Sequence, residues 1–131
     1  MMIELDLQSE IPIYTQLMDQ IIEGIASGRL EPGESLPSVR SLASDIGINL
    51  HTVNKAYTLL KQEGFIQVHR KKGVIVVQKE EMPQVTEHYL AKLGQQLRPV
   101  VAESLCRGLN QEQLTEIIAR LYNDIQPQDK E

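Results

Sequence analysis

Apolar residues recur every three to four positions in two short stretches near the middle of the chain, which predicts two consecutive helices. The stripe of the first comprises Val39, Leu42, Ala43 and Ile46, and that of the second Val53, Ala56, Tyr57 and Leu60. Pro37 suits a first helical residue, because its missing N–H would be unpaired there in any case. Gly47 and Gly64 suit C-terminal caps, and Asn49 suits the N-cap between the helices.

The pattern changes after Gly64. Phe65, Ile66 and Val68 predict a strand, and the β-branched run 74–77 predicts its partner. Between them lies the sequence HRKKG, with four potentially cationic side chains and a glycine for the turn. Alone, this turn reads equally well as a solvated surface loop. Directly after two short helices, it predicts the basic wing of a winged helix-turn-helix, which binds DNA.

Helical spacing continues on both sides of this unit. An amphipathic helix from Pro12 to Gly28 is needed to cover the two stripes. After the polar boundary at residues 78–84, a long helix is expected, which Pro99 kinks or splits. Asn110 and Gln113 form a capping-box pattern at the start of a last helix. Residues from 127 onward are expected to fray.

The fold class that follows is mainly α with a small β-hairpin. A winged helix-turn-helix domain (residues 1–78) precedes an α-helical hairpin tail (residues 79–131). The tail has more apolar positions than two helices can cover, and a second copy of the chain is the simplest partner. The alternative is packing back onto its own winged domain. The candidate dimer interface comprises Tyr89, Leu93, Leu97, Val101, Leu105, Leu114, Ile117, Ile118, Leu121 and Ile125.

Charge is distributed unevenly along the 131 residues, whose net charge is −5. Residues 38–79 hold seven Lys and Arg against two acids, whereas both flanking segments are acidic. The positive block coincides with the expected DNA-reading unit. A single cysteine, Cys106, and no segment resembling a signal peptide or membrane span lead us to expect a cytoplasmic protein. Histidines and cysteine lack ligand spacing, so we expect no metal, no cofactor and no enzyme.

Two sequence patterns in residues 11–77 resemble the GntR family of bacterial transcription regulators. The first, G-x-L-x-P-G-x-x-L-P-S-x-R-x-L-A, spans residues 28–43, and the second, N-x-x-T-V-x-x-A-Y-x-x-L-x-x-E-G, spans residues 49–64. The short tail resembles the YtrA subfamily, which implies a dimer and a link to genes of ABC transporters. Many family members carry other residues at Leu50, Asn54 and Lys71, so the resemblance does not define the operator.

Candidate DNA contacts lie on the two helices and the wing. The resemblance implies roles for Arg40 and Thr52, while His51 and Asn54 are the expected sources of individual specificity. Structural alternatives remain for Arg40 (an ion pair with Asp45 or Glu34), for Ser38 and Asn49 (capping), and for Tyr57 (a core position). The full set is Ser38, Arg40, Asn49, His51, Thr52, Asn54, Lys55, Tyr57, His69, Arg70, Lys71, Lys72 and Gly73.

The sequence therefore predicts a regulator that binds double-stranded DNA as a homodimer. It would repress by occupying a palindromic operator at a promoter. Two alternatives stay open: a winged-helix module that binds proteins, and a sensor whose small-molecule effector releases it from DNA.

Overall fold

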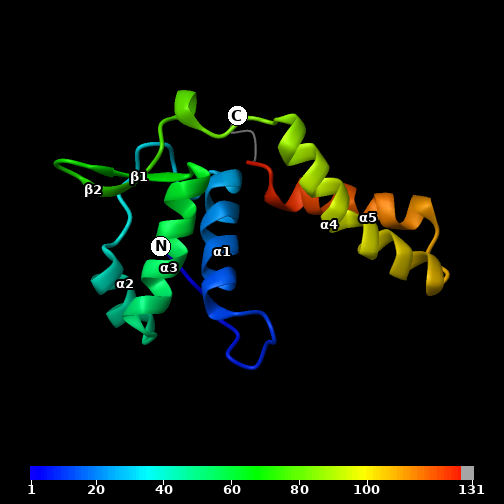
Figure 1. Cartoon of the computed structure of the whole chain (residues 1–131), viewed down its shortest axis with the longest axis horizontal. Coiled ribbons are helices and arrows are strands. Elements are labelled where there is room, and N and C mark those ends of the chain that lie inside the picture. The colour runs from blue at the N-terminus through cyan, green and yellow to red at the C-terminus, as the bar shows by residue number, and fades with distance from the viewer. Residues whose placement is uncertain (128–131) are drawn as a thin grey trace. The chain divides into compact units, whose positions relative to one another are not determined.

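The computed structural model describes residues 1–127 and divides the chain between Pro83 and Gln84 (Figure 1). The first unit holds three helices and a β-hairpin, and the second, Gln84–Gln126, holds two helices. The division falls a few residues after the expected one at residue 78, because Met82 still packs against the core of the first unit. The expected fraying concerns residues that lie almost entirely outside the described part.

Helix α1 (Ile13–Ser27), helix α2 (Val39–Ile46) and helix α3 (Leu50–Glu63) follow the predicted stripes. Gly47 and Gly64 end α2 and α3 in the left-handed conformation, as expected. The start of α2 differs from the prediction. Ser38 is its N-cap, with its Oγ 3.0 Å from the Ser41 N–H that donates to it, so Pro37 lies before the helix rather than in its first turn.

Strand β1 (Ile66–His69) pairs antiparallel with strand β2 (Gly73–Val76), in a register that sets Ile66 opposite Val76 and His69 opposite Gly73. The connection before α2 adds an edge to this hairpin. The Leu36 N–H donates to Val74 O at 2.8 Å, and Ser35 forms a bridge with Ile75. Residues 33–36 therefore tie the start of α2 to the base of the wing. A short 3-10 helix, η1 (Lys79–Glu81), follows β2.

One aliphatic core joins the elements of the first unit, and α3 contributes most to it. Leu17 and Ile21 of α1 pack against α3, while the strands cover its C-terminal end. The buried core residues are Leu17, Ile21, Leu30, Leu36, Leu42, Ala43, Val53, Ala56, Tyr57, Leu60, Ile66 and Val76. Helix α1 thus covers the stripes of the two short helices, as the sequence predicted, and the hairpin completes the core.

Two glutamines of α1 bind the lead-in segment, residues 1–12, which precedes the helix. The Gln16 side chain is buried, accepts from the Asp6 N–H at 2.9 Å, and donates to the carbonyls of Asp6 and Ile11. Gln20, one turn later, accepts from the Glu4 N–H at 2.8 Å and donates to the Glu4 carbonyl. Each carboxamide therefore acts like a backbone peptide group toward the lead-in.

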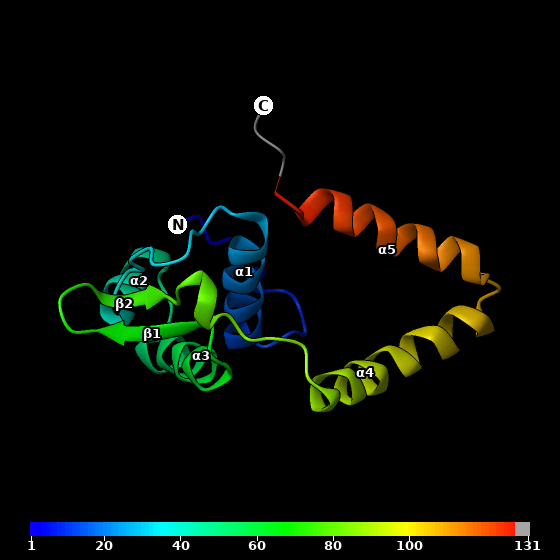
Figure 2. The same cartoon turned by 90° about the horizontal axis from the view of Figure 1, so that it is seen from above.

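The second unit consists of helix α4 (Glu87–Cys106) and helix α5 (Gln111–Ile125). We expected Pro99 to kink or split helix α4. The helix continues through Pro99, so it is not split. The capping box at the start of α5 is present, with Asn110 and Gln113 bonded reciprocally. Figure 2 shows the two helices diverging from the turn that joins them, and they make little contact along their length.

Candidate nucleic-acid interface

Helix α2 presents Ser38 and Arg40 at its N-terminal end, and both are exposed. Ser38 caps the helix, but its hydroxyl proton is not used by that bond. Arg40 forms no ion pair with Asp45 or Glu34 in the described part of the chain. Its guanidinium is thus available for a phosphate or a guanine edge, the two partners that suit its planar fork.

Helix α3 carries its candidate residues in its first two turns. Asn49 is the N-cap, as predicted, with Oδ1 2.7 Å from the His51 N–H that donates to it. His51 and Asn54 are exposed, and Thr52 is half-buried. The N-terminal turns of a second helix are the part of this motif that enters the major groove.

Lys55 is held by a residue that the sequence analysis did not single out. Its Nζ lies 4.0 Å from the centroid of the Tyr14 ring, in the first turn of α1. Tyr14 and Lys55 are far apart in the sequence, and no short motif links them. The only sequence signal was an aromatic residue at the polar start of a helix that was expected to pack against α3.

Tyr57 belongs to the core, which corrects its proposed contact with DNA. The side chain is fully buried, and its hydroxyl donates to the carbonyl of Pro37 at 2.8 Å. Burial raises the pKa of Tyr57 to about 12. Of the two alternatives that the sequence left open, the structure supports the core position, where Tyr57 ties α3 to the start of α2.

The wing closes on the imidazole of His69. The Lys71 and Lys72 N–H groups both donate to its Nδ1, at 3.1 and 3.3 Å. A ring nitrogen that accepts carries no proton, so the proton of the neutral ring lies on Nε2. Gly73 has a φ of +75°, which a residue with a side chain rarely adopts, and it completes the turn. The side chains of Arg70, Lys71 and Lys72 are left exposed.

The positive charge of this surface is not neutralised by ion pairs within residues 1–127. The described residues form three ion pairs, Arg29–Glu23, Arg107–Glu103 and Arg120–Glu116, and all three lie outside residues 38–79. Arg40 and the three wing cations therefore keep their charge for an external anion. The surface combines exposed cations with two capped helix N-termini, which suits binding of phosphate groups.

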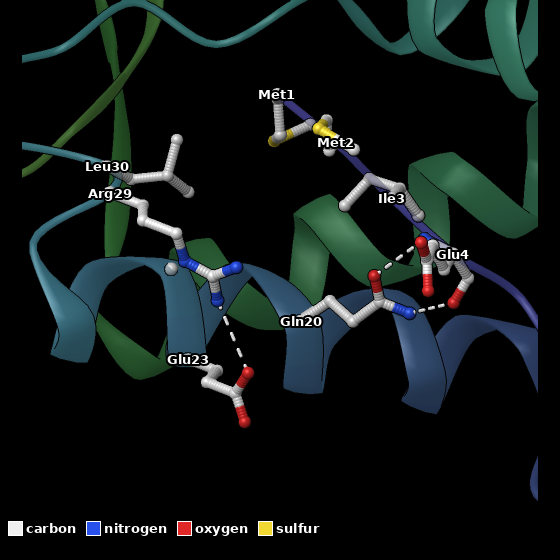
Figure 3. A pocket seen from close by; sticks show the side chains of 9 residues that line it. Met1, Met2, Ile3, Glu4, Gln20, Glu23, Arg29 and Leu30 are labelled. Atoms are coloured by element: carbon white, nitrogen blue, oxygen red, sulfur yellow. Dashed lines mark hydrogen bonds and ion pairs between the residues drawn. The ribbon is translucent and has the colours of Figure 1, made fainter. Parts of the chain in front are cut away.

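A hollow of about 530 Å³ lies between the lead-in segment and α1 (Figure 3). Three of its four polar side chains, those of Gln20, Glu23 and Arg29, already have partners. Arg29 pairs with Glu23 at 3.2 Å, and Gln20 is bonded to the backbone of Glu4. No set of polar groups therefore converges on an absent ligand here. Within residues 1–127 no group of His, Cys, Asp and Glu side chains is arranged to hold a metal ion.

The candidate dimer residues form apolar stripes on α4 and α5, and no residue of either helix, both lying in the described part, is buried. Leu93, Leu114 and Ile125 are half-buried, and the other candidates are exposed.

None of the helices in residues 1–127 has the length and hydropathy to cross a membrane.

A winged helix-turn-helix with an unneutralised basic face defines a DNA-binding transcription regulator, and comparison with known proteins gives the family. Residues 13–76 match the bacterial regulatory proteins of the gntR family. The chain belongs to the GntR family and, as predicted, resembles its YtrA group. It is a regulator and not an enzyme.

Three relatives match over nearly the whole chain. The HTH-type transcriptional repressor YtrA of Bacillus subtilis is 35% identical over 95% of both chains. YtrA from Sulfolobus acidocaldarius, a GntR-family transcription factor of known structure, is 39% identical over 94% of this chain and 98% of its own, with a TM-score of 0.54. A transcriptional antiterminator from Listeria monocytogenes has a TM-score of 0.89 at 28% identity, covering 100% of this chain and 97% of that one.

Proposed function

We propose that this regulator is a homodimeric repressor that occupies a palindromic operator, with one winged unit on each half-site. The observation that carries the proposal is the basic face, whose cations form no ion pair within the described chain while ion pairs form elsewhere. Helix α3 would read bases through His51, Asn54 and Thr52. Arg40, Ser38 and the wing would hold phosphates.

The tail supports the dimeric form. Its two helices leave their apolar stripes uncovered, and a symmetric partner would cover both with the same residues. Two winged units held at a fixed separation match the symmetry of a palindrome. Repression needs only that the dimer block a promoter, and the relative from Bacillus subtilis is named a repressor. Since its target would be chromosomal DNA, we expect it to work in the cytoplasm.

Selection of bound duplexes from a random DNA pool tests this proposal directly. We expect an enriched palindrome whose half-sites are separated by about one helical turn. A matched RNA pool serves as a control, because one structural relative is named an antiterminator. Enrichment of RNA alone, or of a single asymmetric site, would contradict the proposal.

The salt dependence of binding tests the wing. Replacing Arg70, Lys71 and Lys72 with Ala should weaken binding to every duplex, because phosphate contacts carry no sequence information. The slope of log K against log salt should flatten by about 0.9 for each phosphate that the variant no longer neutralises. The matched control replaces Lys61, an exposed lysine at the opposite end of α3, and should leave the slope unchanged. An unchanged slope for the wing variant would remove the wing from the interface and favour a protein-binding module.

A further inference from the structure

The contact between Tyr14 and Lys55 joins a helix outside the helix-turn-helix to the candidate reading helix. Tyr14 stands in the first turn of α1, Lys55 in the second turn of α3, and the two helices pack against each other. The Lys55 ammonium lies 4.0 Å from the ring centroid, where the negative face of an aromatic ring attracts a cation. This places the cation of Lys55 beside the turns that carry His51 and Asn54.

We propose that Tyr14 is a positioning residue of the DNA interface, which holds the Lys55 ammonium ready for a backbone phosphate. The proposal rests on the DNA-binding role of the winged unit. A lysine side chain has four flexible carbons and loses much rotamer freedom when it binds. A ring that already restrains the ammonium reduces this loss, because part of the ordering is present before DNA arrives.

Lys55 differs in this respect from the other lysine of α3. Lys61 is also exposed, but no ring contact restrains it within the described chain, and it lies in the last turn. The ring covers one side of the Lys55 ammonium, and the exposed side chain leaves the other side open to a further acceptor. An ammonium is a compact point charge, which suits a phosphate better than the paired acceptors of a base edge. Lys55 therefore adds affinity without sequence preference.

A double-mutant cycle on duplex binding by the full-length chain tests the pair. Tyr14→Leu should weaken binding about two- to five-fold on all duplexes, the range of an exposed cation–π contact. Tyr14→Phe keeps the ring and should bind like wild type. Lys55→Ala should lower the salt slope by about 1. Adding Tyr14→Leu to Lys55→Ala should then cause no further loss, whereas adding it to the control Lys61→Ala should cause the same loss as in wild type.

A spectroscopic measurement keeps the proposal testable if Tyr14→Leu folds poorly. The ε-methylene protons of Lys55 should resonate upfield, under the ring current of Tyr14, both in the free protein and in the DNA complex. Additive losses in the cycle, a loss in Tyr14→Phe equal to that in Tyr14→Leu, or a normal Lys55 shift in the complex would each overturn the positioning role. If wild type itself bound no duplex, the proposed DNA-binding function would fail. The three outcomes above contradict only the positioning role of Tyr14, so the two failures are distinguishable.

Discussion

Similar apolar stripes are buried in the winged unit and exposed in the tail. Leu17 and Leu60 of the winged unit are 0% exposed, whereas Leu121 and Leu105 of the tail are 51% and 69% exposed. Both sets stand at helical spacing, so periodicity alone does not separate them. The difference is that α1, α2, α3 and the hairpin close around one core, while α4 and α5 diverge.

This contrast shows what a hydrophobic stripe does and does not specify. A stripe shows which face of a helix must leave water, but the covering element depends on the rest of the fold. In the winged unit the cover comes from the same chain. In the tail we propose that it comes from a second copy, because a patch of this kind marks an interaction surface. Variants in each unit can test the two halves of the contrast separately.

The largest effect is expected from Leu121→Asp in the full-length chain. A charge in the proposed apolar interface has no partner, so the dimer should separate into monomers. Operator affinity should fall roughly 10²- to 10⁴-fold, because the second half-site is no longer bound at high effective concentration. Sedimentation reports the mass, and titration on one and two half-sites reports the coupling.

Thr115→Asp provides the matched control, since Thr115 is an exposed polar residue of the same helix. It should stay dimeric and bind as wild type does. A chain cut after Gln78 should behave like Leu121→Asp, because the core of the winged unit lies almost entirely before that residue. A truncated domain that stays dimeric, or binds the full palindrome with undiminished affinity, would give the tail another role.

Leu60→Ala should lower the free energy of unfolding of the winged unit by about 2–5 kcal/mol, because it leaves a cavity in a closed core. Leu105→Ala, made in the monomeric Leu121→Asp chain, should change the free energy of unfolding of the tail by less than about 0.5 kcal/mol, because Leu105 is 69% exposed within one copy. Denaturant titration of both variants measures the contrast. A loss for Leu105→Ala as large as that for Leu60→Ala would contradict the contrast, because it would mean that Leu105 is buried within one copy of the chain.

Tyr57→Phe should give the winged unit a different response to high pH. The pKa of Tyr57 is raised from 10.0 to about 12 in the folded chain, so its contribution is fully present below pH 10. As pH rises through 12, the free energy of unfolding of wild type should fall by about 2–3 kcal/mol, and the phenylalanine variant should not show this fall. At neutral pH the variant should be less stable by about 1–3 kcal/mol, because the Pro37 carbonyl loses its donor. Parallel stability curves for the two chains from pH 9 to 12 would contradict this role.

Asn54→Ala should cost about 1–3 kcal/mol on the preferred duplex and relax the preference at one position in each half-site. The side chain is exposed on α3, and no packing is lost with it. Thermal unfolding should therefore be unchanged. Identical selected sequences for wild type and variant would show that Asn54 reads no base.

Local sequence patterns predicted the elements of both units but did not predict the long-range contacts. The caps at Asn49, Gly47 and Gly64, the hairpin and the capping box of α5 were all expected, because each depends on neighbouring residues. The pair of Tyr14 and Lys55 was not, because it depends on how two helices pack.

The same reason explains part of the corrections. Ser38 begins α2 through a local bond to the Ser41 N–H, but the Pro37 carbonyl accepts from the Tyr57 hydroxyl, twenty positions away. The edge at residues 33–36 forms only because β2 offers its free side. For the Pro37 carbonyl and for the edge, the partner is distant in sequence, and a helical or alternating pattern does not indicate it.

The glutamine clamp of α1, formed by Gln16 and Gln20, has a consequence for the dynamics of the lead-in. Glu4 and Asp6 belong to no helix or strand, yet their N–H groups are bonded to the side chains of Gln20 and Gln16. Hydrogen exchange at these two amides should therefore be slow, and should be slowest at Asp6, whose partner is buried. Exchange at these amides would thus report the opening of α1, as exchange in a protected strand reports the opening of a sheet, although the segment has no neighbouring strand.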